Sequence, residues 1–253
     1  MPRPERLLAR HLRDGGVAGL SLDVFDTLVL RPSRPEILRF GAIAGRQNLG
    51  LVEAGWQSPG VSALWRTRLR CHKAAYDRRR AGGPEPRHHD ILAAMCPPLA
   101  LPLAAVEVLA ATEVAYETAI ARPNRRLLRL LEDVDLPVVL TSDMYLSAAA
   151  LARIVAVACP SLAGLPVVVS AEHGTSKRAG PLFDIAVARL GLTPDRVLHV
   201  GDDPLADVTR ARERGLAALH WPRPLPWKLA HRFQDRLARA VMRRMGWIAA
   251  PSA

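Results

Sequence analysis

The chain has 253 residues, of which 49% are hydrophobic and 23% are charged. These proportions suit one large α/β domain, or a core domain with a smaller insertion, and they argue against wholesale disorder. The net charge of +11 invites a nucleic-acid role, but no zinc-ligand spacing, RNP-like aromatic pattern or Walker A loop accompanies it. We therefore expect no specific nucleic-acid partner.

The cysteines and the apolar tracts indicate in which cellular compartment the protein is expected. Three cysteines are scattered without a CxxC pair: Cys71, Cys96 and Cys159. This pattern favours a reducing compartment over a disulfide framework. The apolar run after the basic N-terminus carries Asp23 and Asp26, which is not typical of a secretory signal, and the longest apolar tract, 146–170, is broken by Arg153 and by prolines. We expect a cytoplasmic protein.

In chain order, the first expected strand is 18–24, a short apolar run rich in Leu and Val. No comparable strand occurs over residues 35–120. Their apolar residues recur at helical spacing, interrupted by Gly and Pro at 59–60, 82–86 and 97–98. We interpret 35–120 as a helical insertion.

The second half of the chain alternates short apolar strands with helical patterns. Strands are expected at 137–141, 166–170, 196–201 and 216–220, and helices at 147–158, 180–190 and 204–214. Continuous apolar strands joined by helices are typical of a parallel sheet covered on both faces, so we predict a doubly wound (Rossmann-like) α/β fold. Residues 1–34 and 121–225 would form this discontinuous core.

Residues 226–253 form a third predicted segment, set off by a Pro cluster at 222–226. Apolar and basic residues recur at helical spacing in WKLAHRFQDRLARAVMRRMGW, which predicts a basic amphipathic helix. Such a helix either docks on the core or on a protein partner, or lies on an anionic membrane surface. The sequence does not decide between these roles and indicates no oligomeric state.

Chemically capable side chains follow four of the expected strands. They are Asp23, Asp26 and Thr27 after the first, Thr141, Ser142 and Asp143 after the second, Lys177 after the third, and Asp202, Asp203 and Asp207 after the fourth. One acidic strand end is often only a helix N-cap. Four polar ends meet at the same edge of a parallel sheet, which is where ligands bind in this fold. The sequence therefore predicts one site there.

The residue types in this set suit phosphoryl chemistry. Carboxylates from two strands repel each other and need a hard cation, for which Mg²⁺ is suited. The hydroxyl of Ser142 and the ammonium of Lys177 can hold a phosphate, and we count Thr27, Thr141 and Asp143 as further candidates for binding it. Asp23 is then available to attack phosphorus and form an aspartyl-phosphate.

Four segments resemble, in order, the motifs of the haloacid dehalogenase (HAD) superfamily: DVFDTL, VVLTSD, SKRAGPLF and VGDDPLADV. Taken together, the four segments are similar to those of a bacterial group of predicted HAD hydrolases, some of them attached to glycosyltransferases. The resemblance covers about residues 18–220. It implies that the helical insertion is a cap that closes over substrate. It also implies Asp23 as nucleophile, Ser142 as phosphate ligand and Lys177 as charge stabiliser.

The same resemblance implies a Mg²⁺ site. It gives Asp202 as a metal ligand together with the nucleophile, and the backbone carbonyl at Phe25 as another. Either Asp207 or Asp203 would orient the metal site and its waters.

The first segment departs from the D-x-D-x-T pattern of HAD phosphatases, whose second aspartate acts as general acid and base. Aligning Thr27 with that threonine puts Phe25 at the acid/base position. General acid–base assistance is worth about 10²–10⁴-fold in rate, roughly 3–5 kcal/mol. Three explanations stay open: Asp26 acts instead through a water, the substrate has a good leaving group, or the enzyme resembles dehalogenases, in which halide leaves unprotonated.

We predict a Mg²⁺-dependent phosphatase that acts on a small phosphorylated metabolite, such as a sugar phosphate, through an aspartyl-phosphate. One alternative is a weakly active or non-catalytic domain that binds a phosphorylated ligand or a partner. The other is a dehalogenase-like, carbon-centred hydrolase. The acidic fourth segment argues against the latter, because displacement of halide by a carboxylate needs no cation.

Overall fold

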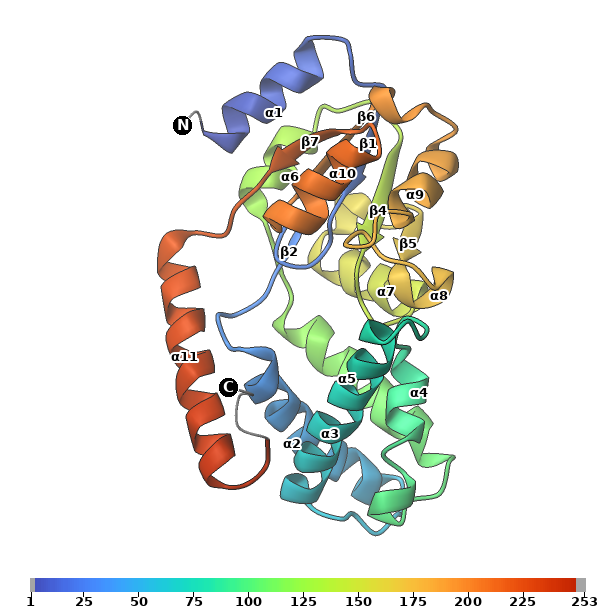
Figure 1. Cartoon of the computed structure of the whole chain (residues 1–253), viewed down its shortest axis with the longest axis vertical. Coiled ribbons are helices and arrows are strands. Elements are labelled where there is room, and N and C mark those ends of the chain that lie inside the picture. Colours follow the sequence, from blue (N-terminus) through green and yellow to red (C-terminus); the bar gives the residue numbers. More distant parts are fainter. Residues whose placement is uncertain (1–2, 249–253) are drawn as a thin grey trace. The chain divides into compact units, whose positions relative to one another are not determined.

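The computed structural model describes residues 3–248 of the chain (Figure 1). The chain divides into two compact units, which are described separately. The α/β unit contains the residues up to Arg31 and the segment Ala121–Arg223. The helical unit contains Pro32–Ile120 and the segment from Pro224 onward.

A five-stranded sheet forms the centre of the α/β unit. Its order is β5-β4-β1-β6-β7, and every neighbouring pair is parallel. The strands are β1 (Gly19–Leu22), β4 (Val138–Ser142), β5 (Val167–Val169), β6 (Val197–Gly201) and β7 (Ala217–His220). Each lies where the sequence predicted a strand, and the doubly wound α/β fold is confirmed.

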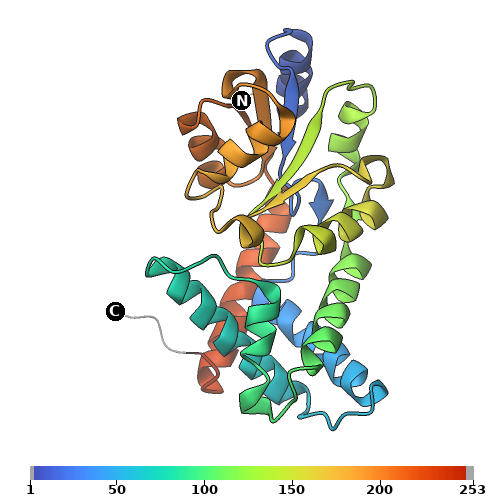
Figure 2. The ribbon, with the colours of Figure 1, turned by 90° about the vertical axis from the view of Figure 1, so that its right-hand side faces the viewer.

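Helices cover both faces of this sheet, with α6 and α7 on one side and α9 and α10 on the other (Figure 2). The helices are α1 (Pro4–Arg13), α6 (Arg125–Leu131), α7 (Ala148–Ala158), α8 (Ser170–His173), α9 (Leu182–Leu190), the π-helix η4 (Pro204–Thr209) and α10 (Arg210–Glu213), with 3₁₀ turns η2 (Pro160–Leu162) and η3 (Pro194–Arg196). Because both faces are covered, every residue of β1 and β6 is buried. Continuous apolar strands are the sequence consequence of that burial.

A short antiparallel pair anchors the segment that follows β1. It joins β2 (Val29–Leu30) to β3 (Arg122–Pro123). Next to it, the side-chain amide of Asn124 donates to the carbonyl of Thr27 at 2.7 Å, and its backbone N–H donates to the carbonyl of Leu28 at 2.8 Å. These bonds fix the turn that carries Asp23 to Leu28 against the start of α6.

The helical unit is built from α2 (Glu36–Glu53), α3 (Val61–Arg80), α4 (His88–Ala93), the 3₁₀ turn η1 (Pro97–Leu99), α5 (Ala105–Ile120) and α11 (Leu225–Arg244). Its core is apolar and includes Leu51, Leu64, Leu92 and Leu109. One buried ion pair joins α3 to α5, in which the Arg68 guanidinium donates to the Glu113 carboxylate at 2.7 Å.

The C-terminal helix α11 belongs to this same compact unit, whereas the sequence pattern predicted 226–253 as a segment of its own. Ala238 and Met242 are buried against Ile37 of α2, with Trp65 and Leu69 of α3 packed around them. Residues 249–253 of the predicted segment lie outside the described part of the chain. Within residues 3–248, no helix is both long enough and apolar enough to cross a bilayer.

Candidate active site

The turn after β1 presents two aspartates in different environments. The backbone N–H of Asp23 donates to the carbonyl of Val200 on β6 at 2.9 Å, which places Asp23 between the two central strands. Asp26 has a φ of +69°, in the left-handed region that Asp tolerates better than most residues. Its N–H donates to the carbonyl of Val29 at 2.8 Å and closes a tight turn.

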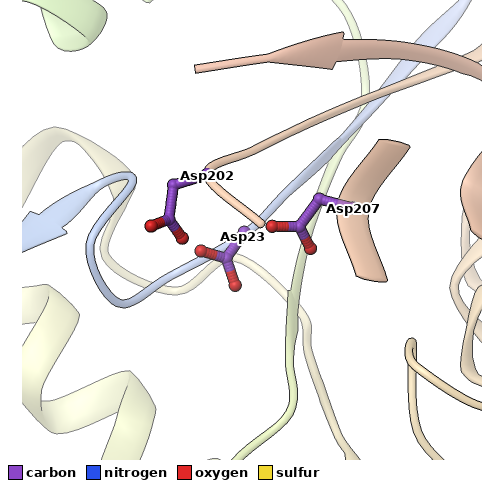
Figure 3. Close-up of side chains that lie close together, drawn as sticks. All are labelled: Asp23, Asp202 and Asp207. Atoms are coloured by element: carbon purple, nitrogen blue, oxygen red, sulfur yellow. The ribbon is translucent and has the colours of Figure 1, made fainter. Parts of the chain in front are cut away.

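Three carboxylates converge at the carboxyl edge of the sheet (Figure 3). They belong to Asp23 after β1, Asp202 after β6 and Asp207 within η4, and one oxygen of each lies within 4.8 Å of the others. We call these three residues the acidic cluster. Oxygen ligands in this number and at this spacing suit a hard divalent cation. The sequence predicted that Asp23 and Asp202 would meet, because the ends of adjacent parallel strands share an edge.

Lys177 is the one cation bonded directly to the acidic cluster among the described residues. Its ammonium donates to Asp23 Oδ1 at 2.5 Å and to Asp207 Oδ1 at 2.6 Å, and the side chain is almost fully buried. Asp143 holds the loop that carries it, since its carboxylate accepts from the backbone N–H groups of Lys177 (2.6 Å) and Arg178 (3.1 Å). Asp143 therefore positions the lysine from the end of β4.

The ionisation of the cluster reflects its burial. Burial raises the pKa of Asp23 to about 8, with Asp207 and Asp202 adding to the rise and Lys177 opposing it. Burial likewise raises the pKa of Asp202 to about 7, helped by the charges of Asp26 and Asp207. Lys177 is not enough to keep all three carboxylates charged. A divalent cation would supply the missing positive charge.

Asp207 has a second neighbour in His199, deep in the sheet. His199 Nε2 lies 3.2 Å from Asp207 Oδ1, its Nδ1 lies 2.8 Å from the Ser21 hydroxyl, and that hydroxyl lies 2.9 Å from Thr141 Oγ1. Burial lowers the pKa of His199, so this ring is neutral. Burial would raise the pKa of Asp207, but Lys177 and His199 together lower it well below its usual range. The chain of polar groups crosses β4, β1 and β6 and fixes Asp207 from behind.

Ser21 and His199 were not predicted as part of the site. Each is the one polar residue near the middle of an apolar strand, and the two occupy paired positions of β1 and β6. Ser21 and His199 could have been linked only by knowing the register of β1 against β6, which the sequence pattern does not give. Thr141, a candidate for phosphate binding, is buried, and its hydroxyl is bonded to Ser21 within the sheet.

The side chain of Asp203 bonds to groups outside the acidic cluster. Its Oδ1 accepts from the N–H groups of Leu205 (2.8 Å) and Ala206 (3.0 Å), which caps the π-helix, and its Oδ2 pairs with exposed Arg178. Its backbone N–H donates to Asp207 Oδ2 at 2.9 Å. The sequence left Asp207 and Asp203 as alternatives for orienting a metal site, and this geometry favours Asp207.

Two buried oxygens at the turn have no hydrogen-bond partner among residues 3–248. They are Asp23 Oδ2 and Thr27 Oγ1. A buried polar atom without a partner is costly, so each is expected to bind a group supplied from outside the chain. Ser142 is also buried and ends β4 at the same edge of the sheet. The donor set thus fits both a cation and a phosphoryl group.

Asp26 does not join the acidic cluster. Its carboxylate pairs with Arg31 at 2.8 Å and with Arg223. Although burial opposes ionisation, these two guanidinium groups, Arg31 foremost, lower the pKa of Asp26 to about 2. The Arg31 guanidinium also lies 4.3 Å from the ring centre of Phe25. A carboxylate held this firmly in its charged form is a poor proton donor, which disfavours Asp26 as the substitute acid.

Replacing Asp26 by Asn is expected to destabilise the protein by about 2 kcal/mol at pH 7, because Arg31 and Arg223 lower the pKa of this carboxyl from 3.8 to about 2. A depressed pKa stabilises the fold above the ordinary pKa of 3.8 and loses that contribution as the pH falls toward 2. Urea unfolding of the two proteins should therefore differ at pH 7 and converge near pH 2. Asp14→Asn, which removes an exposed pair with Arg10, is the control and should change little. Equal stability at pH 7 would contradict the assigned pairing.

Comparison with known proteins finds a family match for part of the sequence and solved structures with a similar fold. Residues 175–220 match the family described as HAD-hydrolase-like. No curated protein matches the chain by sequence. Among solved structures, a 2-haloacid dehalogenase from Pseudomonas syringae pv. Tomato DC3000 is 16% identical, with a TM-score of 0.55 over 81% of this chain and 86% of that one.

Two further structures are similar in the same way. The L-2-haloacid dehalogenase from Xanthobacter autotrophicus, with chloropropionic acid covalently bound, is 17% identical, with a TM-score of 0.54 over 89% of this chain and 88% of that one. The putative HAD-hydrolase YfnB from Bacillus subtilis, bound to magnesium, is 11% identical, with a TM-score of 0.51 over 87% and 99%. The resemblance noted in the sequence is thus confirmed: the chain has the HAD fold, and its residues 175–220 carry the sequence of HAD-like hydrolases.

Proposed function

We propose that this HAD-like hydrolase is a Mg²⁺-dependent phosphatase that acts on a small phosphorylated metabolite, such as a sugar phosphate. The observation that carries the proposal is the acidic cluster, in which Asp23, Asp202 and Asp207 bring three carboxylate oxygens within 4.8 Å. Burial raises the pKa of Asp23 and of Asp202, and the neighbouring carboxylates add to the rise, so the cluster lacks positive charge. Displacement at carbon would require no such arrangement.

In the proposed reaction, Asp23 is the nucleophile. An oxygen of Asp23 attacks phosphorus, the bond from phosphorus to the leaving oxygen breaks, and an aspartyl-phosphate forms. Water then attacks this phosphorus, which releases inorganic phosphate and restores the carboxylate. Lys177, fixed between Asp23 and Asp207, neutralises charge on the attacking group and on the phosphoryl oxygens. Ser142 and the unpartnered hydroxyl of Thr27 are the proposed hydrogen-bonding groups for the phosphate.

The groups that would hold Mg²⁺ are the carboxylates of Asp23 and Asp202 and the backbone carbonyl of Phe25. Asp207 would orient this metal site. A bound Mg²⁺ would draw negative charge from the phosphoryl oxygens. Around it, His199 keeps Asp207 in place through the bond to Nε2, and Asp143 keeps Lys177 in place through the backbone. The chain thus supplies a fixed set of charges before substrate arrives.

Proton transfer is the weak point of this site. Phe25 stands where a general acid is expected, and Asp26 is held charged by Arg31 and Arg223. The leaving group must therefore depart without strong protein assistance. We infer substrates whose leaving group is stable as an anion, such as acyl phosphates, enol phosphates or sugar 1-phosphates.

Introducing a carboxyl at position 25 tests this inference. Phe25→Asp is expected to raise turnover of phosphates with poor leaving groups by about tenfold or more, because general acid catalysis is restored. Acyl phosphates, which need little protonation, should respond much less. The measurement is the ratio of kcat/KM for the two substrate classes, with Phe25→Asn as the matched control that adds polarity without a proton. A ratio that is equal in both variants would contradict the assigned defect.

One specific observation favours a dehalogenase as the second candidate. Phe25 supplies no proton, and halide needs none when it leaves. The function is tested by a screen of sugar phosphates, nucleotides, acyl phosphates and 2-haloacids, each with Mg²⁺ and with EDTA. Phosphate release that EDTA abolishes supports the proposal. Halide release that persists in EDTA replaces it with the dehalogenase, and binding of phosphorylated ligands without any turnover replaces it with a non-catalytic domain.

A further inference from the structure

The C-terminal helix α11 exposes a row of large apolar side chains. They stand at every fourth position, the last at the C-cap of the helix, and are each 48–69% exposed: Leu225, Leu229, Phe233, Leu237, Val241 and Met245. Only Ala238 and Met242 of this helix are buried. An amphipathic helix normally turns its apolar side toward the protein it packs on. In α11, only the side that carries Ala238 and Met242 packs against the protein, and the six large apolar side chains remain exposed to solvent.

A row of basic side chains runs beside this apolar row. The helix contains six Lys or Arg residues against the single Asp235: Lys228, Arg232, Arg236, Arg239, Arg243 and Arg244. At about 100° per residue, the first five fall within an arc of roughly 80° that overlaps one edge of the apolar arc of about 200°, whereas Arg244 lies inside the apolar arc. Of the six, only Arg239 forms an ion pair within residues 3–248, with Asp235. We call the apolar row and its basic border the α11 face.

The charge of the α11 face selects its partner. A second copy of the chain would bring the same positive border against it, so self-association through this face is opposed by repulsion. An anionic surface would be attracted, and the net charge of +11 on the chain adds to that attraction. Leu and Phe side chains flanked by Lys and Arg along about 30 Å of helix match the acyl and headgroup layers of an anionic leaflet.

We propose that the α11 face binds the surface of an anionic lipid bilayer, with its apolar row inserted at the acyl boundary and its basic border against the headgroups. The interaction is peripheral and reversible. It does not depend on the chemistry proposed for Asp23, because α11 lies in the helical unit and the acidic cluster lies in the α/β unit. Every side chain that the proposal uses is exposed or half-exposed in the folded chain.

The test is co-sedimentation of the full chain with vesicles of phosphatidylglycerol and phosphatidylcholine in equal parts, compared with phosphatidylcholine alone. The triple variant Leu229→Ser, Phe233→Ser, Leu237→Ser changes three exposed residues and should fold normally, which circular dichroism checks. The matched control is Leu49→Ser with Val52→Ser, two residues of α2 that are 57% and 58% exposed in the same unit. Arg232→Gln with Arg236→Gln tests the basic border.

The expected result is binding to the anionic vesicles that falls about tenfold or more in the triple variant and in the arginine variant, and that is unchanged in the α2 control. Binding should also weaken as salt is raised. Equal binding of wild type and triple variant overturns the proposal, and so does binding that is independent of phosphatidylglycerol. Absence of vesicle binding combined with a concentration-dependent dimer that the triple variant abolishes would also overturn it, and would assign the face to self-association.

Discussion

Replacement of Asp23 by Asn is expected to lower kcat by about 10⁴-fold or more, with the protein still folded. Within the acidic cluster, Asp23 Oδ2 is the one oxygen that is buried without a hydrogen-bond partner among residues 3–248, while Asp23 Oδ1 accepts from Lys177. The amide of Asn keeps the shape of the side chain and removes its nucleophilicity. Because burial raises the pKa of Asp23, loss of the carboxylate should not lower stability.

The comparison needs two readouts. Phosphate release measures the chemistry, and urea unfolding measures the fold. Asp135→Asn, an exposed aspartate of the same unit, is the matched control and should keep full activity and stability. An Asp23→Asn protein that retains more than a small fraction of the wild-type kcat would remove Asp23 from the reaction.

Replacement of Lys177 by Met is expected to cost about 3–5 kcal/mol of folding free energy in the absence of metal, and to abolish most of the activity. The ammonium of Lys177 bridges Asp23 and Asp207, and all three side chains are buried. Without it the charge of buried Asp207, and any charge on Asp23, loses the ammonium that compensates it. This is the largest effect on stability that we expect from a single substitution in the site.

Added Mg²⁺ should restore part of the lost stability, because a cation at the acidic cluster would replace the positive charge that Lys177 supplied. The measurement is urea unfolding of wild type and Lys177→Met, each with Mg²⁺ and with EDTA. Arg178→Met removes the neighbouring cation, whose pair with Asp203 is exposed, and should cost at most about 1 kcal/mol. If Lys177→Met and Arg178→Met are equally mild, the bridge does not hold the site together.

The sheet and the meeting of Asp23 with Asp202 were predictable because both depend on local patterns. Apolar runs of strand length, separated by helical periodicity, specify parallel strands, and the carboxyl ends of such strands share an edge. Lys177 was predictable from its motif. Its bridge to Asp23 and Asp207 follows once the loop after β5 is placed, and Asp143 places it.

The role of Asp26 was not predictable in the same way. Its second partner, Arg223, lies 197 positions away, and neither periodicity nor motif links the two residues. The sequence therefore left Asp26 open as a substitute acid, while the structure holds it as a charged anchor of the turn. The bond between His199 and Asp207 likewise depends on strand register, because it requires β6 to lie directly beside β1.

The C-terminal helix shows a further limit. Its amphipathic pattern was visible, and α11 is helical as predicted. A periodic pattern indicates that one side of a helix is apolar, but it does not say whether that side packs inward or outward. The contact of Ile37 with Ala238 and Met242 turns the apolar row of α11 outward. The cytoplasmic location expected from the sequence stays a prediction.

The central claim is that Asp23 becomes phosphorylated, and trapping this intermediate tests it most directly. With Phe25 and Asp26 unable to activate water, breakdown of the aspartyl-phosphate should be slow, so it should accumulate. The measurement is acid quench of the wild-type protein during turnover of an acyl phosphate with Mg²⁺, followed by mass analysis of the peptide that contains Asp23. We predict a phosphate on Asp23 that is absent with EDTA and in Asp23→Asn. Phosphate release without any adduct on Asp23, or a carbon adduct there from a 2-haloacid without metal, would contradict the account.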